Sequence, residues 1–141
     1  MRRALIDLNV VLDVLMDREP HAEASAALWA HIESGEAEGL LAAHSVPTLY
    51  YLASKARGRP FAERCVADVL GVFGVAPVGR DVVREALALG WADFEDAVCA
   101  TAGAAAGCQV IATRDPKGFH RAPLPALTPA AALVALKIPA R

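Results

Sequence analysis

Three acidic stretches, far apart in the sequence, contain the residues best suited to do chemistry. Asp7 ends one short apolar run, and Asp115 follows another. Between them, Asp93 and Asp96 stand three residues apart. Carboxylates that lie close together repel and raise each other's pKa unless a cation compensates them. Because Mg²⁺ and Mn²⁺ prefer hard oxygen ligands, these acids could hold such an ion if the fold brings them together.

The elements expected around these acids give them a common position. Asp7 and Asp115 both lie at the C-terminal ends of apolar strands, and these ends share one rim in a parallel sheet, where α/β proteins bind ligands. Asp96 lies in the first turn of a helix expected over 93–107, which leads into the second strand. The sequence therefore predicts that the three acids hold a divalent metal, and that a metal-activated water cleaves a phosphodiester.

The rest of the chain alternates short apolar runs with amphipathic stretches, and Gly and Pro separate them. Strands are expected over 3–7, 38–43, 72–78, 110–113 and 123–127. Helices are expected over 9–16, 21–34, 48–56 with Ser45 as its cap, 61–73, 81–89, 93–107 and 130–136. This alternation predicts one doubly wound α/β domain over residues 1–141, with a mainly parallel sheet.

Composition fits a globular protein of this class. The chain has 141 residues, of which 55% are hydrophobic, and no apolar run approaches the roughly 18 residues that a membrane span needs. The first residues lack the pattern of a signal peptide, so we expect no membrane association and a cytoplasmic location. Cys65, Cys99 and Cys108 have no paired spacing and are expected to be reduced packing residues.

The net charge of −2 is unlike that of most nucleic-acid binders, which are basic. The basic residues are nevertheless clustered in two parts of the chain. The candidate contacts to nucleic acid in these clusters are Lys55, Arg57, Arg59, Arg114 and Lys117. For the first cluster, an equally good interpretation is that its members are solvated helix ends.

Each acid also has a structural explanation. Asp7 could cap the helix that follows it, and Asp93 with Asp96 has the spacing of a capping box. Asp115 precedes a proline, as residues that begin turns often do. The two interpretations differ in where the side chains lie, because metal ligands must meet and caps need not.

Taken together, these segments resemble the signature of PIN domains. The matching segments are Ile6–Asp13, Asp93–Ala97 and Ala112–Asp115 with Phe119, in the order and at the spacing of that family. The similarity covers nearly the whole chain and is strongest to bacterial single-domain members related to VapC toxins. It implies a five-stranded parallel sheet in a three-layer α/β/α fold. It also implies an endoribonuclease that uses Mg²⁺ or Mn²⁺, an RNA substrate, a homodimer and, in the toxin branch, a small antitoxin protein that blocks the site.

The resemblance also implies roles for single residues. Asp7, Asp96 and Asp115 match the metal-binding acids of the family. Asn9 and Thr113 match positions that orient the site through hydrogen bonds. These assignments make the three acids the expected catalytic and metal-binding residues.

One departure from the family pattern keeps a second interpretation open. Asp93 matches a frequent but less essential acid, whereas the glutamate usual in the helix after the second strand is replaced by Thr48. The protein is then either a nuclease with fewer acids or a non-catalytic PIN-like module that binds RNA or a protein partner. A phosphoryl-transfer domain with Asp7 as nucleophile is a third interpretation, but the second aspartate that such phosphatases use is Asn9 here.

Overall fold

One parallel sheet organises the computed structural model, which describes residues 2–139. The strands are β1 (Arg3–Ile6), β2 (Glu38–Ala42), β3 (Gly74–Ala76), β4 (Val110–Ala112) and β5 (Ala126–Leu127). Their order in the sheet is β3-β2-β1-β4-β5, and every pairing is parallel. The predicted parallel five-stranded sheet is therefore confirmed, with β1 at its centre and β4 beside it.

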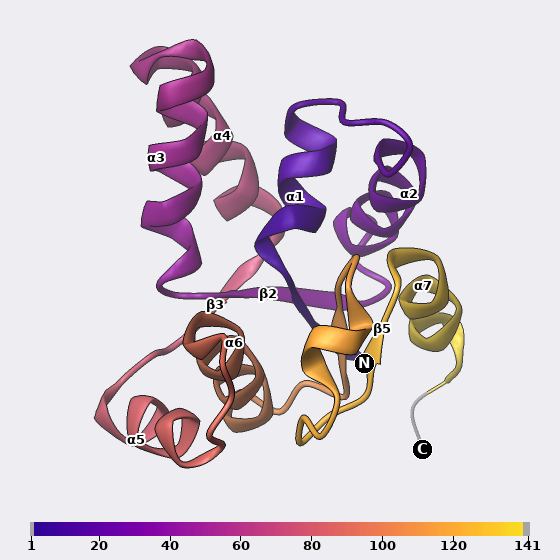
Figure 1. Cartoon of the computed structure of the whole chain (residues 1–141). Helices are drawn as coiled ribbons and strands as arrows, with labels where there is room; N and C mark the ends of the chain where they lie inside the picture. The colour runs from indigo at the N-terminus through magenta and orange to yellow at the C-terminus, as the bar shows by residue number, and fades with distance from the viewer. Residues whose placement is uncertain (1, 140–141) are drawn as a thin grey trace.

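Helices cover both faces of this sheet (Figure 1). They are α1 (Leu8–Leu15), α2 (Ala22–Glu33), α3 (Ser45–Arg57), α4 (Arg59–Val72), α5 (Arg80–Ala88), α6 (Phe94–Ala105) and α7 (Pro129–Lys137), with a short 3₁₀ helix, η1 (Pro116–Phe119). Helices α1, α2 and α7 pack on one face, and α6 packs on the other with α5 against it. The three-layer α/β/α arrangement is thus confirmed.

The side chains of β1 show how the two layers are divided. Ala4 and Ile6 are buried in the core beneath α1, α2 and α7, whereas Leu5 points into the core beneath α6. A Cβ atom on Gly103 of α6 would lie 2.5 Å from Leu5 Cδ2. The missing side chain at Gly103 therefore lets α6 approach the sheet closely.

The predicted break between the third and fourth helices is much shorter than expected. The sequence predicted a helix over 61–73 after a break at 58–60, but α4 begins at Arg59. Gly58 has a left-handed φ of 88°, which reverses the chain in a single residue. Pro60 then fits the first helical turn, where its missing N–H is not needed. Helices α3 and α4 form a hairpin that projects beyond the sheet (Figure 1).

Other differences from the predicted elements are small. The third strand covers Gly74–Ala76, within the expected 72–78, and the fifth covers Ala126–Leu127, within the expected 123–127. Helix η1 was not predicted, and the remaining boundaries lie within a few residues of those expected. Within residues 2–139, the helices are too short or too polar to cross a membrane.

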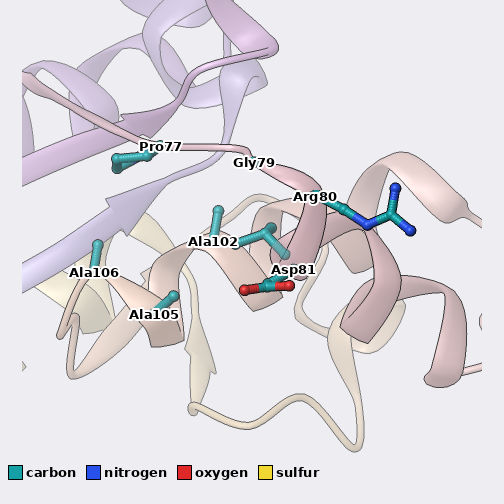
Figure 2. A pocket seen from close by; sticks show the side chains of 8 residues that line it. Pro77, Gly79, Arg80, Asp81, Ala102, Ala105 and Ala106 are labelled. Atoms are coloured by element: carbon teal, nitrogen blue, oxygen red, sulfur yellow. The ribbon is translucent and has the colours of Figure 1, made fainter.

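A hollow beside α5 and α6 contains little that could do chemistry. Small or apolar residues form most of its lining, with Arg80 and Asp81 at one side (Figure 2). Its volume is about 500 Å³, and none of the predicted site residues lines it.

Candidate active site at the carboxyl edge of the sheet

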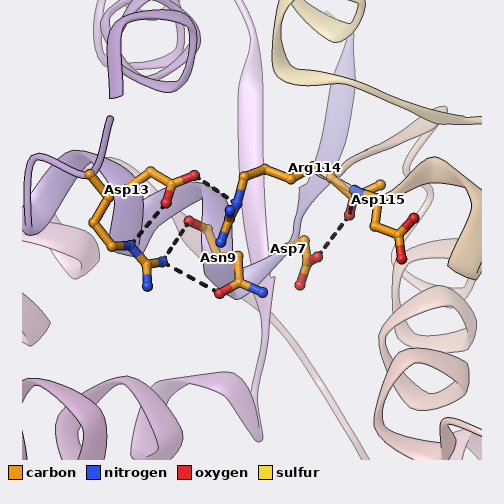
Figure 3. A network of polar contacts seen from close by, with 7 residues as sticks. Asp7, Asn9, Asp13, Arg114 and Asp115 are labelled. Atoms are coloured by element: carbon orange, nitrogen blue, oxygen red, sulfur yellow. Dashed lines mark hydrogen bonds and ion pairs between the residues drawn. The ribbon is translucent and has the colours of Figure 1, made fainter. Parts of the chain in front are cut away.

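Asp7 and Asp115 leave the sheet side by side, because β1 and β4 are neighbours. The backbone N–H of Asp7 donates to the carbonyl of Ala112 at 2.9 Å, which extends the pairing past β1. The buried Thr113 hydroxyl donates to Asp7 Oδ2 at 2.8 Å and accepts the backbone N–H of Asp115 at 3.1 Å (Figure 3). Thr113 therefore ties the two acidic segments together.

Asp96 reaches the same region from the first turn of α6. A Cβ atom placed on Gly118 of η1 would lie 3.2 Å from Asp115 Oδ2 and 3.6 Å from Asp96 Oδ2. Asp93, Asp96 and Asp115 also line one cavity, whose volume is about 730 Å³. A side chain at residue 118 would crowd these carboxylates, so this glycine lets Asp96 and Asp115 both lie close to the backbone of η1.

The electrostatic environment of these acids is unfavourable to their charged forms. Burial raises the pKa of Asp7, although the hydrogen bond from Thr113 opposes this effect. Burial, followed by the charges of Asp93 and Asp7, raises the pKa of Asp96 to about 7. Asp96 is thus poised between its two forms at neutral pH, and a bound cation would favour the ionised form.

The acids do not by themselves form a closed metal cage. Within residues 2–139, no group of three or more His, Cys, Asp or Glu side chains is arranged to hold a metal ion. Mg²⁺ commonly keeps several waters and binds proteins through one or two carboxylates together with substrate phosphate. Asp7 and Asp96, whose pKa values burial raises, and Asp115, which lies beside Gly118, supply carboxylate oxygens of the kind that fits such an ion.

The capping explanation holds for one acid only. Asp93 Oδ1 accepts the backbone N–H of Asp96 at 3.0 Å and caps α6 as the capping-box spacing predicted. The side chains of Asp7 and Asp115 make no capping hydrogen bond to α1 or η1, although both residues stand at the N-cap positions. Capping therefore does not account for the positions of these two side chains.

Asp13, on α1, is a buried carboxylate that lies apart from the three predicted metal-binding acids. It is fully buried, with Arg18 Nε 3.0 Å from Oδ1 and Arg114 Nε 2.9 Å from Oδ2 (Figure 3). The contact with Arg114 is an ion pair that lacks the alignment of a hydrogen bond. Arg18 also donates to the backbone carbonyl and the side-chain Oδ1 of Asn9, both at 3.4 Å. This network ties α1 to the loop that contains Asp115.

The basic residues predicted to contact nucleic acid are used in different ways. Three of them, on the α3–α4 hairpin, contact neighbours on the same hairpin. These contacts are Lys55 Nζ over the Tyr51 ring at 5.3 Å, Arg57 over the Phe61 ring at 5.0 Å, and Arg59 Nε to Glu63 Oε1 at 2.6 Å. Arg114 faces Asp13, whereas Lys117 lines the cavity that contains the acids.

Thr48 gives no sign of replacing a carboxylate. Its hydroxyl donates to the carbonyl of His44 at 3.1 Å, within its own helix. His44 Nε2 lies 3.6 Å from Cys99 Sγ, a contact that the sequence analysis did not predict. Burial, together with the charge of Asp7, raises the pKa of Cys99 to about 12, so this side chain is a neutral thiol. All three cysteines are buried and free, as predicted.

Comparison with known proteins relates this geometry to one family and one group of structures. Residues 3–117 match the family model described as PIN domain. No curated protein matches the sequence.

Several solved structures share the fold. VapC20 of Mycobacterium tuberculosis, described as a toxin that cleaves the sarcin-ricin loop, is 18% identical with a TM-score of 0.67, over 82% of this chain and 92% of that chain. VapBC2 of Rickettsia felis, bound to a promoter DNA fragment, is 12% identical with a TM-score of 0.70, over 89% of this chain and 98% of that chain. FitAcB of Neisseria gonorrhoeae is 19% identical with a TM-score of 0.65, over 89% of this chain and 97% of that chain.

Proposed function

We propose that this chain, which belongs to the PIN domain family, is a divalent-metal-dependent endoribonuclease and the toxin of a toxin–antitoxin pair. One observation supports the proposal: Thr113 hydrogen-bonds to both Asp7 and Asp115, while the carboxylates of Asp115 and Asp96 both lie close to Gly118. Burial and mutual repulsion raise the pKa of Asp96 to about 7. Among the ion pairs found in residues 2–139, none involves these three acids. Within these residues no direct ion pair offsets the charge of the acids, and the charge of Arg114 lowers the pKa of Asp7 less than burial raises it.

In this proposal, Asp7, Asp96 and Asp115 are the ligands of Mg²⁺ or Mn²⁺. When bound, the ion would supply an activated water and offset charge on the leaving oxygen of the phosphodiester. Thr113 would hold the Asp7 carboxylate in place through its 2.8 Å hydrogen bond. Asp93 would fix the first turn of α6, and so the position of Asp96, through the cap.

The experiment that tests this function is cleavage of a varied set of labelled RNAs in Mn²⁺ and in excess chelator. We expect cleavage by the wild-type protein in Mn²⁺ alone, and none by the Asp7→Asn and Asp96→Asn variants. Asp68→Asn is the matched control, because Asp68 is exposed on α4, away from these acids. Cleavage that persists in chelator, or in both active-site variants, would exclude the proposed mechanism.

A second candidate function is a non-catalytic PIN-like module that binds RNA or a protein partner. The environment of Thr48 favours it, since this position supplies no carboxylate and the hydroxyl is bonded to its own helix. This alternative predicts RNA binding without cleavage and no stabilisation of the protein by Mn²⁺.

We also propose that the protein acts in the cytoplasm as a homodimer, with a small antitoxin as its partner. The similar structures of VapBC2 and FitAB were determined as complexes bound to DNA. Large apolar side chains such as Leu87 and Val134 are exposed here and would be covered by partners. Sedimentation of the protein alone, and of the protein co-expressed with the neighbouring reading frame, tests both partners.

A further inference from the structure

The cavity beside the acids also contains basic and aromatic groups. It lies between the segment that joins α5 to α6 and the loop after β4. Its chemically informative lining residues are Asp96, Asp115, Trp91, Lys117, His120 and Arg121. Acids that would hold a metal and cations that would bind phosphate therefore line one continuous space of about 730 Å³.

Two cations of this cavity, Lys117 and Arg121, differ from the basic residues of the α3–α4 hairpin named above in having no ion-pair or cation–π partner among residues 2–139. Lys117 and Arg121 are exposed, and within residues 2–139 neither takes part in an ion pair. The α3–α4 hairpin, by contrast, uses Lys55 and Arg57 in cation–π contacts of its own. Lys117 and Arg121 are thus the cations whose charge is available to a ligand next to the acids.

Backbone geometry at the end of the loop supports a built site. Arg121 has a φ of 69°, in the left-handed region that residues other than glycine rarely adopt. The backbone N–H of Ala122 donates to the carbonyl of Phe119 at 3.0 Å, so the loop turns tightly around this residue. At this turn Arg121 lines both the cavity beside the acids and a neighbouring hollow formed with residues 122–126.

Trp91 adds an aromatic surface to the same space. Its ring meets that of Phe119 edge to face, with ring centroids 6.0 Å apart. Phe119 is buried, whereas Trp91 is partly exposed and lines the cavity. An indole ring held at one edge and open on another side is a platform on which an unpaired base can stack.

We propose that this cavity binds the nucleotide next to the scissile phosphate of a single-stranded RNA. Lys117 and Arg121 bind the flanking phosphate, and Trp91 contacts the unpaired base. This inference rests on the proposed function for the position of the scissile phosphate at Asp7, Asp96 and Asp115. It moves the RNA path away from the α3–α4 hairpin, where the sequence analysis had placed three of its five candidate contacts.

The test measures binding separately from cleavage. Fluorescence anisotropy with a labelled single-stranded RNA is measured in chelator, in the Asp96→Asn background, so that the RNA stays intact. We expect the Lys117→Ala/Arg121→Ala double variant to bind at least about fivefold more weakly. The slope of log K against log salt should also become shallower by about 1.4, because two phosphate contacts to a single strand are lost.

Lys55→Ala/Arg57→Ala is the matched control, since it removes the same charge from the hairpin. We expect it to change RNA affinity by less than about twofold.

In the otherwise wild-type protein with Mn²⁺, the cavity double variant should raise KM and leave kcat nearly unchanged. Trp91→Ala should weaken binding of the intact RNA but not of an RNA abasic at the flanking position, while Trp91→Phe retains most of the affinity.

The inference is overturned if the hairpin variant weakens binding as much as the cavity variant, or if the cavity variant binds RNA like its parent. It is also overturned if duplex RNA of the same sequence binds as tightly as the single strand. If the wild-type protein cleaves no RNA but the cavity variant still loses affinity, the proposed catalytic function fails while the binding site stands.

Discussion

Two acidic residues at opposite ends of α1 are treated in opposite ways by the protein. Asp13 is completely buried, and two guanidinium groups lie within 3.0 Å of its oxygens. Burial raises the pKa of Asp7, and its side-chain hydrogen-bond partner is the neutral hydroxyl of Thr113. The chain therefore neutralises one carboxylate with its own arginines and leaves the other, beside Asp96, without an equivalent cation. This contrast separates a structural acid from a candidate metal ligand.

Arg114 is the residue at which the two regions meet. It pairs with Asp13, while Thr113 and Asp115 on either side of it belong to the acidic edge. Figure 3 shows its side chain reaching towards α1, while the carboxylate of Asp115 extends the other way. The positive charge of Arg114 lowers the pKa of Asp7, but burial raises this pKa by more.

The largest effect on stability should follow from removing the structural acid. Asp13→Ala leaves two arginines facing a buried space, and breaking a buried ion pair in this way costs about 3 to 5 kcal/mol. We expect urea unfolding to show a loss near the lower end of this range, because Arg18 and Arg114 are partly exposed and can reach water. Asp68→Ala is the control. A loss below about 1 kcal/mol would show that the network is not structural.

Removing one of the two arginines should have a smaller effect, because the other still neutralises Asp13. We expect Arg114→Ala to lower the free energy of unfolding by about 1 to 2 kcal/mol. It should also raise the pKa of Asp7 further, since a nearby positive charge is lost. Urea unfolding and carboxyl NMR titration measure the two effects. A lowered pKa of Asp7 would contradict the arrangement of charges described here.

The smallest expected effect on stability is that of Asp96→Asn, which should stabilise the protein, whereas the two variants above destabilise it. Burial raises the pKa of Asp96 from its ordinary value of 3.8 to about 7 in the folded protein. The folded state therefore binds the Asp96 proton more tightly, so the contribution of Asp96 to stability is fully present below about pH 3.8 and is lost as the pH rises through about 7. In chelator, Asp96→Asn should be more stable than wild type at pH 8, by about 1 kcal/mol or less.

Comparing the stability of Asp96→Asn with that of the wild-type protein at pH 4 checks the predicted direction of this effect. There Asp96 is protonated in the folded protein, and the advantage of the Asp96→Asn variant should disappear. Chemical unfolding at the two pH values, in chelator throughout, measures the difference. An Asp96→Asn variant that is less stable than wild type at pH 8 would mean that the charged form of Asp96 is already compensated.

The sequence predicted the acidic edge because its signal is local: Asp7 and Asp115 end apolar runs, and such runs form adjacent parallel strands. It predicted the cap at Asp93 for the same reason. The pairing of Asp13 with Arg114 was not predictable in this way, because Arg114 lies about a hundred residues away and reaches Asp13 only through the pairing of β1 with β4; its other partner, Arg18, lies five residues from it.

Spacing alone also could not rank the basic residues. Lys55 and Arg59 look as available as Lys117 in the sequence, but the hairpin uses them internally. The positive φ of Arg121 and the close approach of Gly118 to the carboxylates of Asp96 and Asp115 are properties of the folded loop. A useful signal in hindsight is the polar residue Asp13 within the apolar stretch of α1, since a buried acid needs a cationic partner.

Metal binding tests the central claim most directly, namely that the acids at the sheet edge lack a cation that an external ion supplies. Titration of the purified protein with Mn²⁺, followed by calorimetry and by thermal unfolding, should show binding and a rise in Tm. Both should be lost in Asp7→Asn and Asp96→Asn and kept in Asp68→Asn. Equal Tm values with and without Mn²⁺ for the wild-type protein, or undiminished Mn²⁺ binding by both active-site variants, would contradict the account.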